Sequence, residues 1–217
     1  MRPIVVQVGP LAAPNAANIA ASQTPGAAGN LTLTAGAIAG TTPDTPRRVL
    51  VTTHADESGK TLTISGTDWN NTPITETMTG PNNTTGYTTY DFKTVTQIAV
   101  SAAFAGAVTV GTNGIASSRP IFLDPWSIPQ TSIQVTVSGT INYTVQQTLD
   151  DPNSPTNPVA YTSVTWVNHP DSNLASATAT AQGNYAYVPR MMRILVNSNT
   201  NPATVVMTVI QSNVVTD

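Results

Sequence analysis

The chain has 217 residues, of which 40% are hydrophobic and only 9% are charged. Globular proteins usually carry about a quarter charged residues, so Thr, Asn, Gln and Ser must supply most of the polar surface here. The net charge of -3 and the scattered basic residues argue against a nucleic-acid binder, which needs a basic stripe. The absence of cysteine excludes disulfides, a thiolate zinc site and a cysteine nucleophile.

The start of the chain gives no sign of a membrane segment. Met1 leads directly into a short apolar run that prolines and polar residues soon interrupt, and no run is long enough to span a bilayer. We therefore expect no signal peptide, no membrane insertion and synthesis in a cytoplasm.

Residues 1–30 predict an extended N-terminal arm. Ile4–Val8 alternates like a strand, but the following GPLAAPNAANIAASQTPGAAGN is dominated by small residues, prolines and polar residues and cannot build a core of its own. A helical turn over residues 15–22 is an alternative for part of it. The arm is either flexible or lies on a neighbouring subunit.

Residues 31–124 predict a first β domain, centred on a hairpin over Thr61–Gly80. Leu62 and Ile64 alternate with hydroxyl residues before a polar turn, and Ile74 and Met78 do so after it, which is typical of strands with one buried face. The same alternation predicts further strands at 31–34, 48–53, 91–100 (with a bulge), 107–110 and 121–123. Seven or eight short strands indicate a sandwich or barrel.

The sequence DPWSIP at residues 124–129 predicts a domain boundary, because two prolines flank an aromatic residue. Residues 125–217 then predict a compact β-sandwich, with strands at 132–137, 141–148, 161–167, 177–181, 185–188, 193–196 and 203–210. The predicted fold class is all-β, with two small β-sandwich or barrel-like domains after the arm.

Few residues offer chemistry. His54 and His169 lie far apart beside turns, and without cysteine only carboxylates could complete a zinc site, so loop-surface histidines are expected. Asp150, Asp151 and Asn153 could offer oxygen ligands to Ca²⁺, but the EF-hand spacing is absent and an Asx turn explains them better.

A paired-carboxylate site has little support. Asp68 and Glu76 flank the hairpin and Glu57 lies near its base, but a glycosidase needs two carboxylates that face each other across a sugar. The sequence also lacks the phosphate-loop, dinucleotide, nucleophile-elbow and zinc-protease motifs. We expect that the chain is not an enzyme and that it binds no cofactor and no metal ion.

The middle of the chain resembles a widespread, mostly uncharacterised family of tailed-bacteriophage virion proteins. The resemblance is carried by PRRVLVTT, DESGKTLTISGTDWNNTPITETMTGPNNTT and DFKTVTQIAVSAAFAGAVTVGTNG, and it spans roughly residues 20–120. GTINYTVQQTLDDPNSPTNP and TVVMTVIQS are similar to phage structural proteins, less specifically. The resemblance implies a place in the virion and carries over no catalytic residue.

These observations predict a structural component of a bacteriophage particle, a capsid decoration or cement protein that binds the head shell. A neck, collar, tail or fibre-attachment protein is the alternative, and a host-glycan-binding module that uses loop aromatics is a third. The expected partners are the major capsid protein or other virion proteins, and copies of the chain itself as a trimer or higher oligomer. The candidate subunit-contact residues are Ile4, Val5, Val6, Val8, Leu11, Ile19, Trp69, Tyr87, Tyr90 and Trp126.

Overall fold

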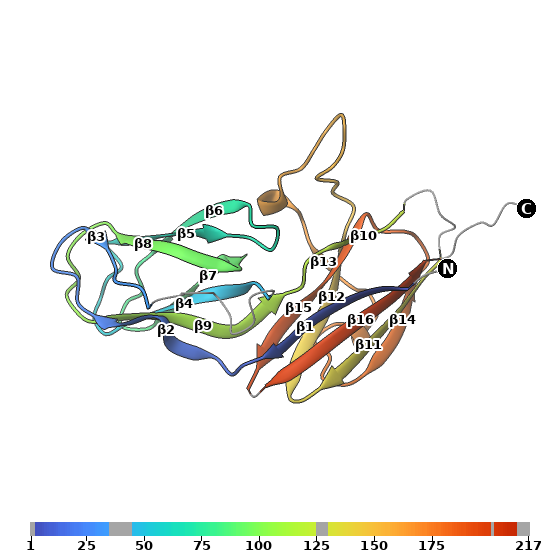
Figure 1. Cartoon of the computed structure of the whole chain (residues 1–217), viewed down its shortest axis with the longest axis horizontal. Helices are drawn as coiled ribbons and strands as arrows, with labels where there is room; N and C mark the ends of the chain where they lie inside the picture. The colour runs from blue at the N-terminus through green and yellow to red at the C-terminus, as the bar shows by residue number, and fades with distance from the viewer. Residues whose placement is uncertain (1–2, 35–44, 125–129, 201, 212–217) are drawn as a thin grey trace, which may run out of the picture. The chain divides into compact units, whose positions relative to one another are not determined.

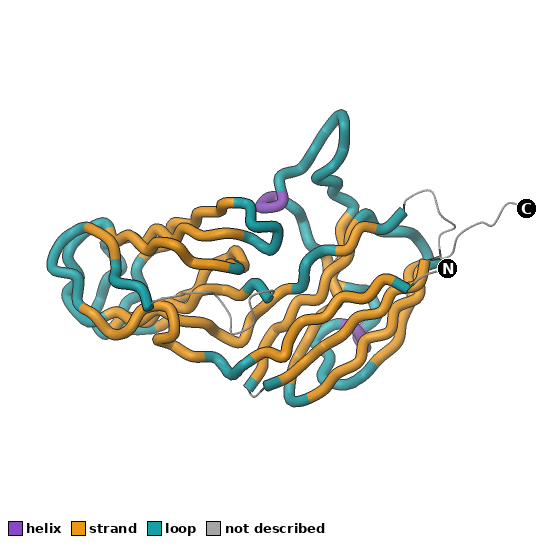
Figure 2. Tube along the Cα trace, viewed as in Figure 1, coloured by secondary structure: helices purple, strands orange, loops and turns teal. Residues whose placement is uncertain are grey.

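The computed structural model describes residues 3–34, 45–124, 130–200 and 202–211. The described residues confirm the all-β prediction, because almost every regular element is a strand (Figure 2). The chain divides into two compact units. We call residues 11–116 the inserted unit, and residues 1–10 together with 117–217 the discontinuous unit.

The inserted unit contains two antiparallel sheets, seen as two layers in Figure 1. The first has the strand order β3-β8-β5-β6, and the second places β2, β9, β4 and β7 side by side. The bounds are β2 Asn15–Gln23, β3 Gly29–Asn30, β4 Arg47–Thr53, β5 Thr61–Thr67, β6 Pro73–Thr79, β7 Thr85–Phe92, β8 Thr94–Val100 and β9 Val108–Ser117.

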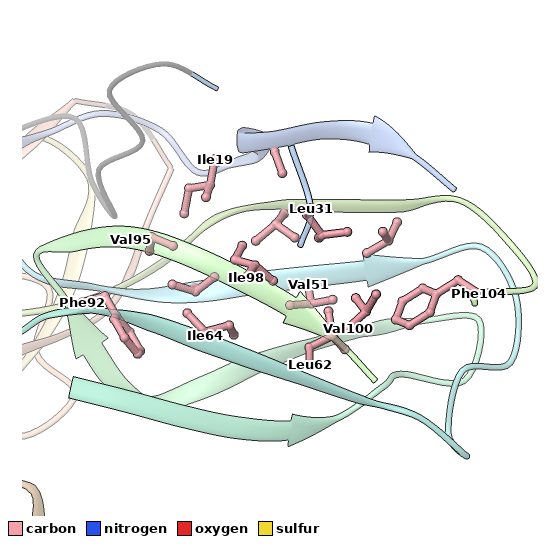
Figure 3. Close-up of a cluster of buried hydrophobic side chains, with 14 of the residues drawn as sticks. Ile19, Leu31, Val51, Leu62, Ile64, Phe92, Val95, Ile98, Val100 and Phe104 are labelled. Carbon is pink, nitrogen blue, oxygen red and sulfur yellow. The ribbon is translucent and has the colours of Figure 1, made fainter. Parts of the chain in front are cut away.

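The hydrophobic core of the inserted unit follows from period-two alternation (Figure 3). Leu62 and Ile64 of the predicted hairpin are fully buried, as are Val49 and Val51 of β4. The register Thr61↔Thr79 to Thr67↔Pro73 confirms the hairpin over Thr61–Gly80.

The run Asp91–Val100 forms two strands in different sheets instead of the single bulged strand that the sequence predicts. Phe92 ends β7 in one sheet, and Thr94 begins β8 in the other. Phe92 and Val95 are both buried although they are three residues apart. The change of phase between Phe92 and Val95 is therefore the point where the chain passes between sheets. The change between Val95 and Ile98 matches the predicted bulge, because the register of β8 with β5 shifts between Val95 and Gln97.

The discontinuous unit is also built from antiparallel strands. One sheet has the order β1-β16-β11-β14, and in the other β12 pairs with β13 and β15, and β15 with β10. The bounds are β1 Ile4–Leu11, β10 Ile121–Phe122, β11 Thr131–Ser138, β12 Ile141–Thr148, β13 Val167–Asn168, β14 Ala181–Tyr185, β15 Met191–Asn199 and β16 Ala203–Gln211. The described helices are two three-residue turns, η1 Tyr161–Ser163 and η2 Ser172–Leu174, and neither could cross a membrane.

The expected N-terminal arm differs from what residues 3–30 form. Ile4–Leu11 is strand β1 of the discontinuous unit, where Val6 and Val8 are buried. Asn15–Gln23 forms strand β2 and buries Ile19 and Ala20. This strand includes residues 15–22, for which the sequence offers a helical turn as the alternative. Pairing with β9 overrides the helix propensity of the alanines.

The unit boundaries also differ from the predicted ones at 30/31 and 124/125. The chain passes between units after Pro10 and after Ala116. The early strand β1 belongs to the second unit because the late strand β16 pairs with it. The predicted strand over 161–167 is instead the turn η1 followed by the two-residue strand β13.

Candidate interaction surface

Glu57 is a buried carboxylate that holds two turns of the inserted unit together. Its side chain is fully buried and accepts hydrogen bonds from the amides of Ala105 at 2.8 Å and Gly106 at 2.9 Å. Lys60 Nζ pairs with its other oxygen. Burial raises the pKa of Glu57, but the hydrogen bonds from Lys60, Gly106 and Ala105 outweigh it and hold the pKa below its usual value. Glu57 is therefore an ionised structural group.

Glu76 is occupied in the same way at a bulge in β7. Its two carboxylate oxygens accept the amides of Thr89 at 2.7 Å and Tyr90 at 2.9 Å. The register of β4 with β7 shifts at this point, and the Thr88 hydroxyl accepts the amide of Val49. The carboxylate thus satisfies two amides that the bulge removes from the ladder.

Asp68 organises the turn of the central hairpin. Its Oδ1 accepts the amides of Asn70 at 2.8 Å and Thr72 at 2.9 Å. Asp68, Glu76 and Glu57, the three acids considered for a carboxylate pair, are thus each bound to backbone amides. Such hydrogen bonds stabilise the fold and leave the carboxylates poorly placed to transfer protons.

The two histidines lie in different units. His54 is exposed, as expected for a loop residue, but His169 is only 4% exposed, so the expectation of a surface position is wrong for it. Its Nδ1 accepts the amide of Asp171 at 3.0 Å, and its ring lies 4.4 Å from that of Tyr185. Burial lowers the pKa of His169, and the Asp171 carboxylate opposes this only in part. Among the described residues, no cluster of three or more His, Asp or Glu could hold a metal ion.

The acidic loop after β12 is held by protein contacts. Asp151 Oδ1 accepts the amide of Asn153 at 2.9 Å, which is the predicted Asx turn. Its other oxygen lies 2.8 Å from Arg190 Nε, and Asp150 Oδ2 accepts the amide of Thr165 at 2.7 Å. Three of the carboxylate oxygens considered as calcium ligands therefore already have partners within the protein.

Arg47 is a buried charge that no sequence pattern indicates. The residue is fully buried at the start of β4, and its Nη2 donates to the Ala12 carbonyl at 2.9 Å. Burial lowers the pKa of its guanidinium to about 10. Arg47 ties β4 to the segment after β1, a structural use of a scarce charge.

The outward side of the sheet β3-β8-β5-β6 is a surface of hydroxyl groups, which we call the hydroxyl face. Its side chains pair across strands, with Oγ distances of 3.0 Å for Thr63 to Thr77, 3.2 Å for Ser65 to Thr75, and 2.7 Å for Thr67 to Thr94. Its hydroxyl residues are Thr61, Thr63, Ser65, Thr67, Thr75, Thr77, Thr79, Thr94 and Thr96, and Asn30, Gln97 and Ala99 lie on the same side.

The outward side of the sheet β1-β16-β11-β14 is the second uncharged surface, which we call the amide face. It combines amide and hydroxyl side chains with exposed aliphatic ones, including Val5 at 49% and Ile210 at 44% exposure. It consists of Val5, Gln7, Ser132, Gln134, Thr136, Gln182, Asn184, Thr204, Val206, Thr208 and Ile210. Neither the hydroxyl face nor the amide face contains a charged residue.

The predicted subunit-contact residues divide by burial. Val6, Val8, Leu11 and Ile19 are buried in the chain's own fold, which accounts for their apolar character. The others remain candidates: Ile4 and Trp69 are half-buried, Val5 and Tyr87 are exposed, and Tyr90 packs partly on the core of the inserted unit. Trp126 lies outside the described residues.

The comparisons with known proteins add no assignment: no protein-family model matches the chain, and no curated protein matches it.

Proposed function

We propose that this chain is a structural component of a bacteriophage particle, a capsid decoration or cement protein that binds and stabilises the head shell. The observation that carries the proposal is the pair of uncharged sheet faces, one in each unit. The resemblance of residues 20–120 to phage virion proteins supports the same conclusion.

The distribution of charge explains why these faces suit protein contacts. Many of the chain's few charges are used inside the fold or in short-range pairs, such as Glu57 with Lys60 and Asp151 with Arg190. A contact between uncharged faces buries no unpaired charge, which would be costly to desolvate. The paired hydroxyls of the hydroxyl face also keep hydrogen-bond partners when water leaves.

The decisive experiment is the copy number of the protein in purified virions, measured by quantitative mass spectrometry against the major capsid protein. A decoration protein follows the shell subunits, so its copy number approaches theirs. A copy number of about a dozen, as expected for a ring-shaped neck or tail component, would replace decoration by the neck or tail alternative. Absence from the particle would refute a virion role.

A second measurement tests the stabilising role. Removing the gene product should lower the temperature at which heads release DNA, and adding back the purified protein should restore it. Thr63→Lys with Thr77→Lys places two charges on the hydroxyl face without touching the core. Loss of add-back activity in this variant would identify that face as the shell contact, whereas Ser132→Lys with Gln134→Lys tests the amide face in the same way.

A further inference from the structure

The first six residues of strand β1, Ile4–Gly9, occupy a sheet edge without the usual protection against pairing with another chain, because the strand's one proline, Pro10, lies near its end. The sheet order places β16 on one side of β1 and no described strand on the other. An edge strand presents backbone amides and carbonyls that can pair with a further strand. Proteins usually prevent this with charges, prolines, bulges or very short edge strands.

The other sheet edges among the described strands carry such protection. β3, β10 and β13 are two residues long, and β14 has five residues with Gly183 at its centre. β6 begins with Pro73, and the edge strand β7 carries a bulge at which Glu76 binds two amides. β2 is covered where Gln23 Nε2 and Oε1 bond the backbone of Thr32 at 2.9 Å each.

β1 differs from all of these. From Ile4 to Gly9 it contains no charged residue and no proline, and Pro10 lies beyond this stretch near the end of the strand. Val6 and Val8 are buried in the core, and pairing with β16 on one side leaves the other backbone edge of β1 presented. Val5 and Gln7 are exposed on the other side. The stretch is six residues long, which is a typical strand length.

We propose that β1 pairs antiparallel with β1 of a second copy, so that the two four-stranded sheets join into one sheet of eight strands. A two-fold contact between identical edges satisfies the backbone groups of both copies at once. The segment carries no like charges that would repel each other across the axis. The contact also brings two copies of the exposed Val5 together and extends the amide face across both chains.

This inference gives a two-fold contact, in place of the trimer or higher oligomer expected from the sequence, and its test does not depend on a phage particle. The oligomeric state of the purified full chain is measured by sedimentation over a wide range of concentrations. The expected result is a reversible dimer. A chain that is monomeric at every concentration overturns the inference and leaves the proposed virion role to its own copy-number test.

The edge variant is Val5→Lys with Gln7→Lys, which adds like charges beside the axis on exposed positions. We expect its dimer dissociation constant to rise by about tenfold or more. The matched control is Ser132→Lys with Gln134→Lys, which adds the same charge to the same face on β11, an interior strand. An edge variant that dimerises like the wild type, or a dimer that only the control dissociates, overturns the edge contact.

The absence of native cysteine provides a readout if the lysine variant does not fold. Single Val5→Cys and Gln7→Cys variants are oxidised mildly and run on a denaturing gel, with Gln134→Cys as the control. Covalent dimers at position 5 or 7 and not at 134 support the edge contact. Equal cross-linking at all three positions, or cross-linking at 134 alone, overturns it.

Discussion

Replacing Glu57 tests whether a buried carboxylate holds the inserted unit together. In Glu57→Gln the amide oxygen can still accept the Ala105 and Gly106 amides, but both bonds lose their charge. Hydrogen bonds to charged groups contribute roughly 1.5–3 kcal/mol and neutral ones roughly 0.5–1.5, so each bond weakens by about 1 kcal/mol. The lost pairing with the partly exposed Lys60 adds at most about 1 kcal/mol. The expected loss of unfolding free energy is therefore about 2–3 kcal/mol.

Two further variants should lose less and more stability, respectively, than Glu57→Gln. Lys60→Met removes the ion pair but leaves both amide bonds, so it should cost no more than about 1 kcal/mol. Glu57→Ala leaves two buried amides without a partner and should cost about 2–6 kcal/mol. Urea unfolding followed by circular dichroism gives all three values. If Glu57→Gln costs no more than Lys60→Met, the amide bonds do not carry the stabilisation and the reasoning is refuted.

The pH dependence of the same group has a definite sign. The pKa of Glu57 is lower in the folded chain than the ordinary value of 4.5, so the unfolded chain binds the proton more readily. The stabilisation is fully present above that ordinary value and is lost as the pH falls through the folded-state pKa. The difference in stability between wild type and Glu57→Gln should therefore shrink in acid.

Three further predictions concern single positions. Burial lowers the pKa of His169 below its ordinary 6.5, so the contribution of the neutral ring to folding stability is present above that pH and is lost as the pH falls. His169→Gln should therefore flatten the acid limb of a plot of melting temperature against pH, and an unchanged slope would contradict this. Glu76→Gln should cost about 1–2 kcal/mol and speed hydrogen exchange at the Thr89 amide, measured by NMR. Gly111→Ala should destabilise strongly in a thermal melt because its Cβ would lie 1.9 Å from a backbone oxygen of β2, whereas the unobstructed Gly59→Ala should change stability by less than about 0.5 kcal/mol.

Alternation of side chains predicts most of the strands because burial of one sheet face is visible in the local sequence. The central hairpin, β4, β11 and β16 all follow this pattern closely, whereas β12 is buried along nearly its whole length. Where neighbours far along the chain decide the structure, the local pattern is insufficient. Asn15–Gln23 reads as loose or helical, yet it forms β2 because Gly111 lets the backbones of β2 and β9 approach closely.

The candidate surface was only partly predictable. Low charge content indicates uncharged contacts, but which residues lie together depends on strand order. The sequence predicts the valines of β1 as subunit contacts because they are apolar. Val6 and Val8 are instead buried in the chain's own core. Arg47 and Glu57 left no sequence signal, since a single buried charge has no periodicity.

The discontinuity of the second unit sets an order of events during synthesis. β1 leaves the ribosome before the inserted unit, whereas its partner β16, Ala203–Gln211, leaves after that unit. The inserted unit can close while β1 still waits, because domains generally fold as units as they emerge. Joining β1 to β16 then closes a very long loop, a slow kind of contact. Until that moment, neighbouring nascent chains carry the same unpaired strand, so assembly and folding compete for one segment.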